Sequence, residues 1–243
     1  MLKIGDKMPS FEVLDQDGKT VKSGDFIGKG KKTVVYFYPK DNTSGCTAEA
    51  CSIRDNWEAL RAAGYNVVGV SKDSDKSHAG FAARHALPFT LLADTTREMH
   101  EAFGAIGEKK MYGKTVLGTL RRTFIFDEYG TLERIIEKVD TKNAAAQILY
   151  DVTPISDITE NGIRKASFRT CGVTCSTQIN LETEGDTIRR VEIVKGCDGN
   201  TKGVARLCEG RKIREVIGLL EGIDCKGRGT SCPDQLARAL KEL

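Results

Sequence analysis

The stretch that decides the fold is Tyr36-Phe-Tyr-Pro-Lys-Asp-Asn-Thr-Ser-Gly-Cys46-Thr-Ala-Glu-Ala-Cys51. The apolar run 33–38 that overlaps its start is typical of a buried β-strand, and the polar residues after it indicate a loop. A helix-forming segment then begins near Cys46. A thiol at a helix N-terminus lies among unpaired N–H groups and partial positive charge, which lower its pKa and favour the reactive thiolate. With Cys51 five residues later, this stretch indicates a redox site.

Segments of strand and helix alternate through the first 150 residues, which predicts an α/β sheet. An antiparallel hairpin, with its turn at Asp127-Glu-Tyr-Gly130, is expected near the end of this part. The predicted strands are 33–38, 66–71, 89–93, 119–126 and 131–138, the predicted helices are 46–63, 74–85, 96–103 and 143–150, and residues 104–118 are expected to form a loop.

The last third of the chain has a different pattern, which predicts a small α+β domain. Residues 153–163 contain proline, glycine and polar side chains without periodicity and are expected to form a linker. The domains are therefore predicted as 1–152 and 164–243. The second domain is expected to contain strands at 165–170, 177–183 and 187–195 and helices at 199–208, 211–221 and 233–242.

Composition excludes several function classes. Over 243 residues the formal net charge is only +3, which does not call for a nucleic-acid partner. No apolar run approaches the ~18–20 residues of a membrane span, and the start of the chain lacks the pattern of a signal peptide. We therefore expect a cytoplasmic protein without a membrane partner. In a reducing cytosol, the 8 cysteines are more often catalytic or metal-binding than structural disulfides.

The spacing Pro39-x-x-x-Thr43-x-x-Cys46 places a hydroxyl about one helical turn before the thiol. The Thr43 side chain can hydrogen-bond the sulfur or an oxygen bound beside it, and Pro39 can shield the site from water. A cation is expected from Arg121 or Arg122, which face opposite sides of a strand, so that only one can serve. The three histidines carry no Cys–His signal and are expected on the surface or on helix faces: His78, His85 and His100.

The motif around Cys46 and Cys51, together with the later Arg-x-Thr-Phe, resembles peroxiredoxins of the Q type (bacterioferritin comigratory protein) over roughly residues 1–150. The resemblance implies a thioredoxin-like fold and a thiol-dependent peroxidase that acts on hydrogen peroxide and organic hydroperoxides without a cofactor. It implies thioredoxin or a similar dithiol as the reductant, and a monomer or weak dimer.

Carried over position by position, the resemblance makes Cys46 the peroxidatic nucleophile and Cys51 the resolving thiol. Pro39 and Thr43 complete the loop, and Arg121 orients the peroxide. Arg122 stands where the family usually has a small polar residue, so either arginine could face the site.

Disulfide formation within this motif has a geometric cost. Residues five apart in an α-helix have Cα atoms ~8–9 Å apart, whereas a disulfide requires less than ~7 Å. The helix around Cys46 and Cys51 is therefore expected to unwind locally during turnover.

The C-terminal segment resembles the TSCPD domain over about residues 163–243, at Gly-Cys197-x-Gly-Asn and Thr-Ser-Cys232-Pro-Asp-Gln-Leu. The four cysteines of that family fall on Cys175, Cys197, Cys225 and Cys232. Four thiolates can hold zinc or an iron–sulfur cluster, although the spacings are not those of common zinc knuckles.

Other uses of these thiols stay open. Cys171-x-x-x-Cys175 has knuckle spacing and permits a different ligand set, and a redox relay to the Cys46–Cys51 disulfide is a further alternative. Cys208, on a predicted helix, is expected to be a small buried side chain. For the whole chain, a peroxide sensor coupled to a metal module remains an alternative, and a general thiol–disulfide oxidoreductase is less favoured because the site is not C-x-x-C.

Overall fold

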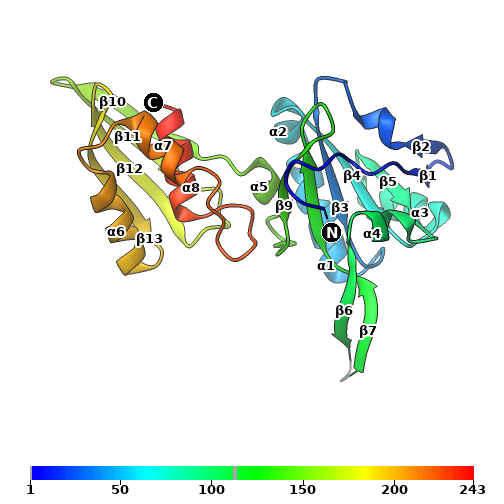
Figure 1. The fold of residues 1–243 in the computed structure, drawn as a ribbon. Coiled ribbons are helices and arrows are strands. Elements are labelled where there is room, and N and C mark those ends of the chain that lie inside the picture. The colour runs from blue at the N-terminus through cyan, green and yellow to red at the C-terminus, as the bar shows by residue number, and fades with distance from the viewer. Residues whose placement is uncertain (1, 112–113) are drawn as a thin grey trace. The chain divides into compact units, whose positions relative to one another are not determined.

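The computed structural model describes residues 2–111 and 114–243. The chain forms two compact units, Met1–Ile148 and Leu149–Leu243. The first is a mixed α/β unit and the second combines an antiparallel sheet with helices (Figure 1). No helix among the described residues has the length and apolar character needed to cross a membrane.

The first unit is built on a seven-stranded sheet with the strand order β2-β1-β5-β4-β3-β8-β9. Strands β3, β4 and β5 run parallel, and β8 lies antiparallel to β3 on its other side. The loop after β3 therefore emerges beside the start of β8. The strands are β1 (Glu12–Asp15), β2 (Thr20–Lys22), β3 (Lys32–Phe37), β4 (Tyr65–Ser71), β5 (Thr90–Ala93), β8 (Arg122–Phe126) and β9 (Leu132–Ile136).

Five α-helices and one short 3-10 helix accompany this sheet: α1 (Ser44–Asp55), α2 (Trp57–Ala62), α3 (Asp75–His85), α4 (Glu98–Ala102), α5 (Ala144–Leu149) and η1 (Ser23–Phe26). The single helix expected at 46–63 is divided at Asn56, whose side chain donates a hydrogen bond to the Ser52 carbonyl at 2.9 Å. An asparagine bonded to the backbone in this way competes with helix continuation. Helix α3 is capped by Ser74, whose Oγ accepts from the Ser77 N–H.

Strand β3 is buried on both faces, as expected for a central strand. Val35 and Phe37 point into one apolar cluster with Val68 and Val70 of β4. Because side chains alternate along a strand, Tyr36 points to the opposite face. Helix α1 lies on that face, where its residues Cys46 and Glu49 interact electrostatically with Tyr36.

Two segments differ from the sequence-based expectation. Within 104–118, expected to be a loop, β6 (Ile106–Met111) and β7 (Lys114–Thr119) pair as a hairpin that extends away from the sheet (Figure 1); residues 112–113 lie outside the described part. Within 153–163, expected to be a linker, β10 (Thr153–Glu160) pairs with β11 (Ile163–Arg169). Every residue of β10 is exposed, so the strand has no buried alternation for a sequence pattern to reveal.

The second unit is a four-stranded antiparallel meander in the order β10-β11-β12-β13, followed by three helices. Apolar side chains from β11, β12 and β13 form one core with those of the helices, including Phe168, Ile179 and Leu236. This agrees with the predicted α+β class. The remaining elements are β12 (Ser176–Glu184), β13 (Thr187–Lys195), α6 (Asp198–Cys208), α7 (Ile213–Leu220) and α8 (Cys232–Lys241).

Candidate active site

Cys46 lies in the first turn of α1, two residues after the first helical residue, Ser44. The N–H groups of a first turn have no partner within the helix, and they carry the positive end of the helix dipole. The cysteine is only 1% exposed. It is therefore a buried thiol held where a negative charge is stabilised.

Arg121 is the arginine that reaches this thiol. It immediately precedes β8, and its neighbour Arg122 is paired with Phe37 at the end of β3. Arg121 Nη2 lies 3.3 Å from Cys46 Sγ. Arg122 instead donates to the Gly104 carbonyl oxygen at 2.9 Å. The alternation along the strand thus separates the two arginines, and the one that resembles the family position faces the thiol.

Glu49 is a further residue of this site, to which the sequence analysis assigned no role. It follows Cys46 by one helical turn and forms an ion pair with Arg121 Nη1. The spacing i, i+3 puts the two side chains on one face of α1, and this was the available signal. The carboxyl group is fully buried, and its Oε1 has no hydrogen-bond partner among the described residues.

Burial raises the pKa of Glu49 to about 7, although the neighbouring Arg121 opposes the shift. Burial alone would lower the pKa of Arg121, but Glu49 and Cys46 outweigh it and the pKa is raised. The guanidinium is therefore a permanent positive charge between the thiol and the carboxyl group.

Thr43 and Pro39 flank the thiol on the loop side. Thr43 occupies the N-cap position of α1, and its Oγ1 donates to the Lys40 carbonyl oxygen at 3.1 Å rather than to the sulfur. Pro39 is half-buried and lies two residues after the end of β3. Their roles in holding a peroxide remain predictions.

Cys51 lies on the same helix as Cys46, is half-buried and is a free thiol, as is Cys46. Arg54, one turn further along α1, interacts with it electrostatically. A continuous helix therefore separates the two thiols in this reduced state.

Two of the histidines expected on the surface or on helix faces lie on helices, α3 and α4, and are buried. His78 and His100 are both 0% exposed, and each pairs with an aspartate: Asp41 for His78 and Asp94 for His100. Sequence periodicity could not show the pairing of His78, because Asp41 lies 37 residues earlier in the chain.

In the second unit, thiols gather around Arg228. Its Nη1 lies 3.5 Å from Cys175 Sγ. The pKa of Arg228 is raised, first by this hydrogen bond, and Cys225 and Cys232 also contribute electrostatically. Cys232 begins α8 as predicted, after the capping residue Ser231.

This arrangement does not fit a four-thiolate metal centre as it stands. Such a centre needs the thiolates to converge on one cation, whereas here a guanidinium lies beside them. Across residues 2–111 and 114–243, no three His, Cys, Asp or Glu side chains are grouped so as to hold a metal ion. Zinc or an iron–sulfur cluster on Cys175, Cys197, Cys225 and Cys232 stays a prediction, which elemental analysis of the reduced protein would check.

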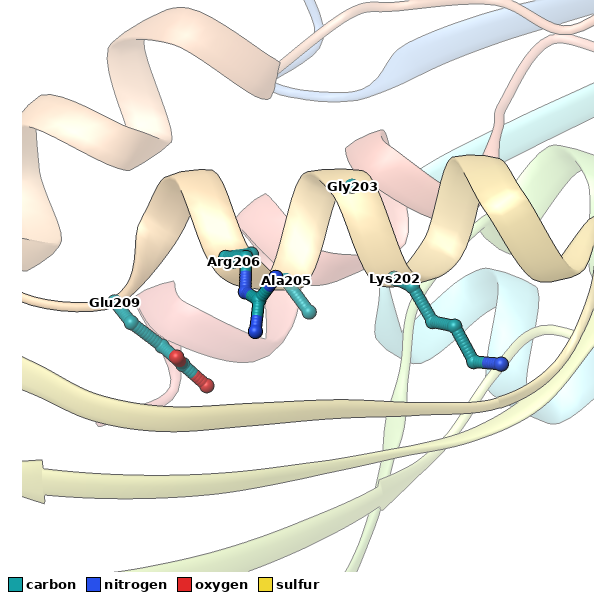
Figure 2. A pocket seen from close by; sticks show the side chains of 5 residues that line it. All are labelled: Lys202, Gly203, Ala205, Arg206 and Glu209. Carbon is teal, nitrogen blue, oxygen red and sulfur yellow. The ribbon is translucent and has the colours of Figure 1, made fainter.

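Cys208 is buried, as expected, and burial raises its pKa to about 11, which leaves it a protonated thiol at neutral pH. A surface hollow of about 460 Å³ lies along α6 nearby, and Figure 2 shows Lys202, Arg206 and Glu209 projecting into it from one side of the helix. No cysteine lines this hollow. It is therefore separate from the predicted thiol sites.

Comparisons with known proteins agree with this geometry. Residues 4–135 match the AhpC/TSA family, and residues 154–243 match the TSCPD domain. The chain therefore belongs to the AhpC/TSA family of thioredoxin-fold peroxiredoxins, which are peroxidases, and carries a TSCPD domain after it.

Within that family the relatives are of the Bcp type. Peroxiredoxin Bcp of Bacillus subtilis is 41% identical over 156 residues, 64% of this chain and 98% of the relative. Peroxiredoxin Bcp of Escherichia coli is 43% identical over 142 residues, 58% of this chain and 90% of the relative. A solved structure of the Xanthomonas campestris bacterioferritin comigratory protein, studied for its alkyl peroxide reduction activity, matches with a TM-score of 0.54 and 34% identity, over 57% of this chain and 87% of that one.

Proposed function

We propose that this peroxiredoxin reduces hydrogen peroxide and organic hydroperoxides with Cys46 as the attacking thiol and Cys51 as the resolving thiol. The observation that carries the proposal is the contact between Arg121 Nη2 and Cys46 Sγ, which are 3.3 Å apart. Cys46 lies in the first turn of α1. A guanidinium fixed beside the sulfur favours the thiolate and can donate to an oxygen that becomes negative. Alkyl peroxide reduction by the similar Xanthomonas protein supports organic hydroperoxides as substrates.

The first step forms one bond and breaks another. The Cys46 thiolate attacks the terminal oxygen of the peroxide, an S–O bond forms and the O–O bond breaks. The oxygen that departs takes up a proton and leaves as water or an alcohol, while Cys46 becomes a sulfenic acid. Arg121 and the N–H groups of the first turn lie where they can stabilise the developing negative charge.

The second step returns the site to a stable state. The Cys51 sulfur attacks the sulfenic sulfur, an S–S bond forms, and the hydroxyl leaves as water. A dithiol, which we take to be thioredoxin or a similar protein, then reduces the disulfide by thiol–disulfide exchange. A continuous α1 holds the two Cα atoms ~8–9 Å apart, so the helix must open before this bond can form.

The proposal is tested by following peroxide consumption coupled to thioredoxin and NADPH. We expect Cys46→Ser to abolish turnover. We expect Cys51→Ser to reduce peroxide once per chain without recycling by thioredoxin. Cys208→Ala, which removes a buried thiol of the second unit, is the matched control and should leave turnover unchanged. Full activity in Cys46→Ser would contradict the proposal.

A further inference from the structure

His78 is fully buried, and both of its ring nitrogens have partners. Nε2 lies 3.1 Å from the Leu92 carbonyl oxygen, and Nδ1 lies 2.9 Å from Asp41 Oδ2. A carbonyl oxygen can only accept, so Nε2 carries a hydrogen. Nδ1 lies within hydrogen-bond distance of both Asp41 carboxylate oxygens, at 3.1 and 2.9 Å, and of the Tyr38 hydroxyl, at 3.3 Å. The ring is therefore fixed through both of its nitrogens.

Asp41 is the charged partner that this arrangement favours. Burial by itself would raise its pKa, but hydrogen bonding and charge from His78 outweigh burial, and the pKa is lowered. Its carboxylate also accepts from the Tyr38 hydroxyl at 2.7 Å and from Ser77 Oγ at 2.7 Å. Asp41 and His78 therefore form a buried pair in which the carboxylate oxygens of Asp41 also have donors in Tyr38 and Ser77.

The pair fastens the loop that leads into the active-site helix. Asp41 lies between β3 and α1, and its backbone N–H donates to Asp73 Oδ2 at 2.7 Å. The next residue, Asn42, adopts the left-handed conformation at φ 58°, and its side chain accepts from Arg84 Nη1 at 3.0 Å. Two successive loop residues are thus tied to α3 and to the turn before it.

None of these anchoring groups belongs to α1. The helix that must open during disulfide formation begins at Ser44, three residues after Asp41. A fixed point just before it would keep the first turn opposite Arg121 in the reduced state. The same fixed point would confine unwinding to the helix itself.

The geometry points to Asp41 and His78 as positioning residues of the peroxidase site, a buried hydrogen-bonded clamp that holds the segment before Cys46 while α1 opens and closes. This inference rests on the proposed role of Cys46 and Cys51. The Asp41–His78 pair contacts none of the reacting atoms, yet it controls the rate at which Cys46 reacts with peroxide. The groups that face the pair are Tyr38, Ser77 and the Leu92 carbonyl, with Asp73 bonded to the Asp41 backbone.

Stopped-flow fluorescence of Trp57, the single tryptophan of the chain, can separate the two steps because this residue begins α2 directly after α1. We expect Asp41→Asn to slow the reaction of Cys46 with hydrogen peroxide on the order of 10- to 100-fold, as a displaced reacting group does. Disulfide formation should keep its rate or become faster.

A matched control is available in the same unit. Asp94→Asn breaks another buried pair, in which Asp94 Oδ2, just after β5, lies 2.6 Å from His100 Nδ1 of α4. This variant should lose stability without slowing the peroxide step. If Asp41→Asn slows that step no more than Asp94→Asn does, the clamp is refuted. The role of Cys46 is tested separately, by the activity of Cys46→Ser.

Double substitution tests whether the two residues act through each other. If they do, Asp41→Asn with His78→Gln should slow the peroxide step no more than the slower single variant, because the interaction is lost only once. Additive losses would contradict the clamp. Should Asp41→Asn fail to fold, Ser77→Ala removes one bond to Asp41 and should slow the same step in the same direction by a smaller factor; an unchanged rate in that variant would also contradict the clamp.

Discussion

At the scale of single residues, the two neighbouring arginines, Arg121 and Arg122, contact different groups. Arg121 bridges Cys46 and Glu49, whereas Arg122 contacts the Gly104 carbonyl and Glu137. The planar fork of an arginine can contact the thiol and the carboxyl group together, whereas a lysine presents one compact charge.

We therefore expect Arg121→Lys to lower the rate of the peroxide step by about 100-fold, the usual cost of losing a placed donor. Arg122→Lys is the matched control and should retain nearly the full rate. Single-turnover kinetics with hydrogen peroxide measures both variants. An undiminished rate in Arg121→Lys would show that the charge alone, and not the fork, matters.

Glu49 gives a pH dependence of stability. Its pKa is raised from 4.5 to about 7 by burial, so the folded state binds its proton more tightly than the unfolded state does. The contribution of Glu49 to the free energy of unfolding is complete below pH ~4.5. It is lost as the pH rises through ~7, and the loss is roughly 3 kcal/mol in all.

Urea unfolding at pH 5 and pH 8 checks this expectation in a Cys46→Ser background, which removes the thiol that also contacts Arg121. The further variant Glu49→Gln should lose less stability than its parent between the two pH values. An identical loss in both proteins would place the origin of the pH dependence elsewhere.

At the scale of elements, the active-site helix is the part that must change. Cys46 and Cys51 lie on one continuous helix, Ser44–Asp55, which keeps them too far apart for a disulfide. Helix α3, which contacts the loop through Ser77 and His78, has no such requirement.

We expect amide hydrogen exchange across Ser44–Asp55 to be faster in the oxidised protein than in the reduced protein, because the opened helix exposes its N–H groups. Exchange in α3 (Asp75–His85) should stay unchanged and serves as the internal control. Equal protection of α1 in both redox states would refute the unwinding step.

At the scale of the whole molecule, eight free thiols are divided between two units, and the proposed cycle uses two of them. One equivalent of hydrogen peroxide should therefore leave six titratable thiols. Mass spectrometry should find one disulfide, Cys46–Cys51. In Cys46→Ser the six thiols of the second unit should stay reduced. A disulfide within the second unit of the wild-type protein would instead favour a relay.

The sequence by itself determined the local features of this protein. The helix start near Cys46, the hairpin around Asp127-Glu-Tyr-Gly130 and the helix start at Cys232 each depend on neighbours in the chain, through turn chemistry, alternation and, for Cys232, capping by Ser231. The peroxiredoxin and TSCPD motifs are also local, so both were recognised before the fold was known. The start of helix α1 was predicted to within two residues, whereas its end at Asp55 and the break at Asn56 were not foreseen.

Only the tertiary structure decided which distant groups meet. Arg121 lies beside Cys46 because β8 pairs with β3. Glu49 is a buried carboxyl group paired with that arginine. His78 is buried beside Asp41, which belongs to a loop far from it in the sequence. The exposed strand β10 exists through backbone pairing with β11 alone. The physical reason is common to all four cases: burial, charge pairing and strand pairing depend on positions in space, and a local pattern of residue types does not contain them.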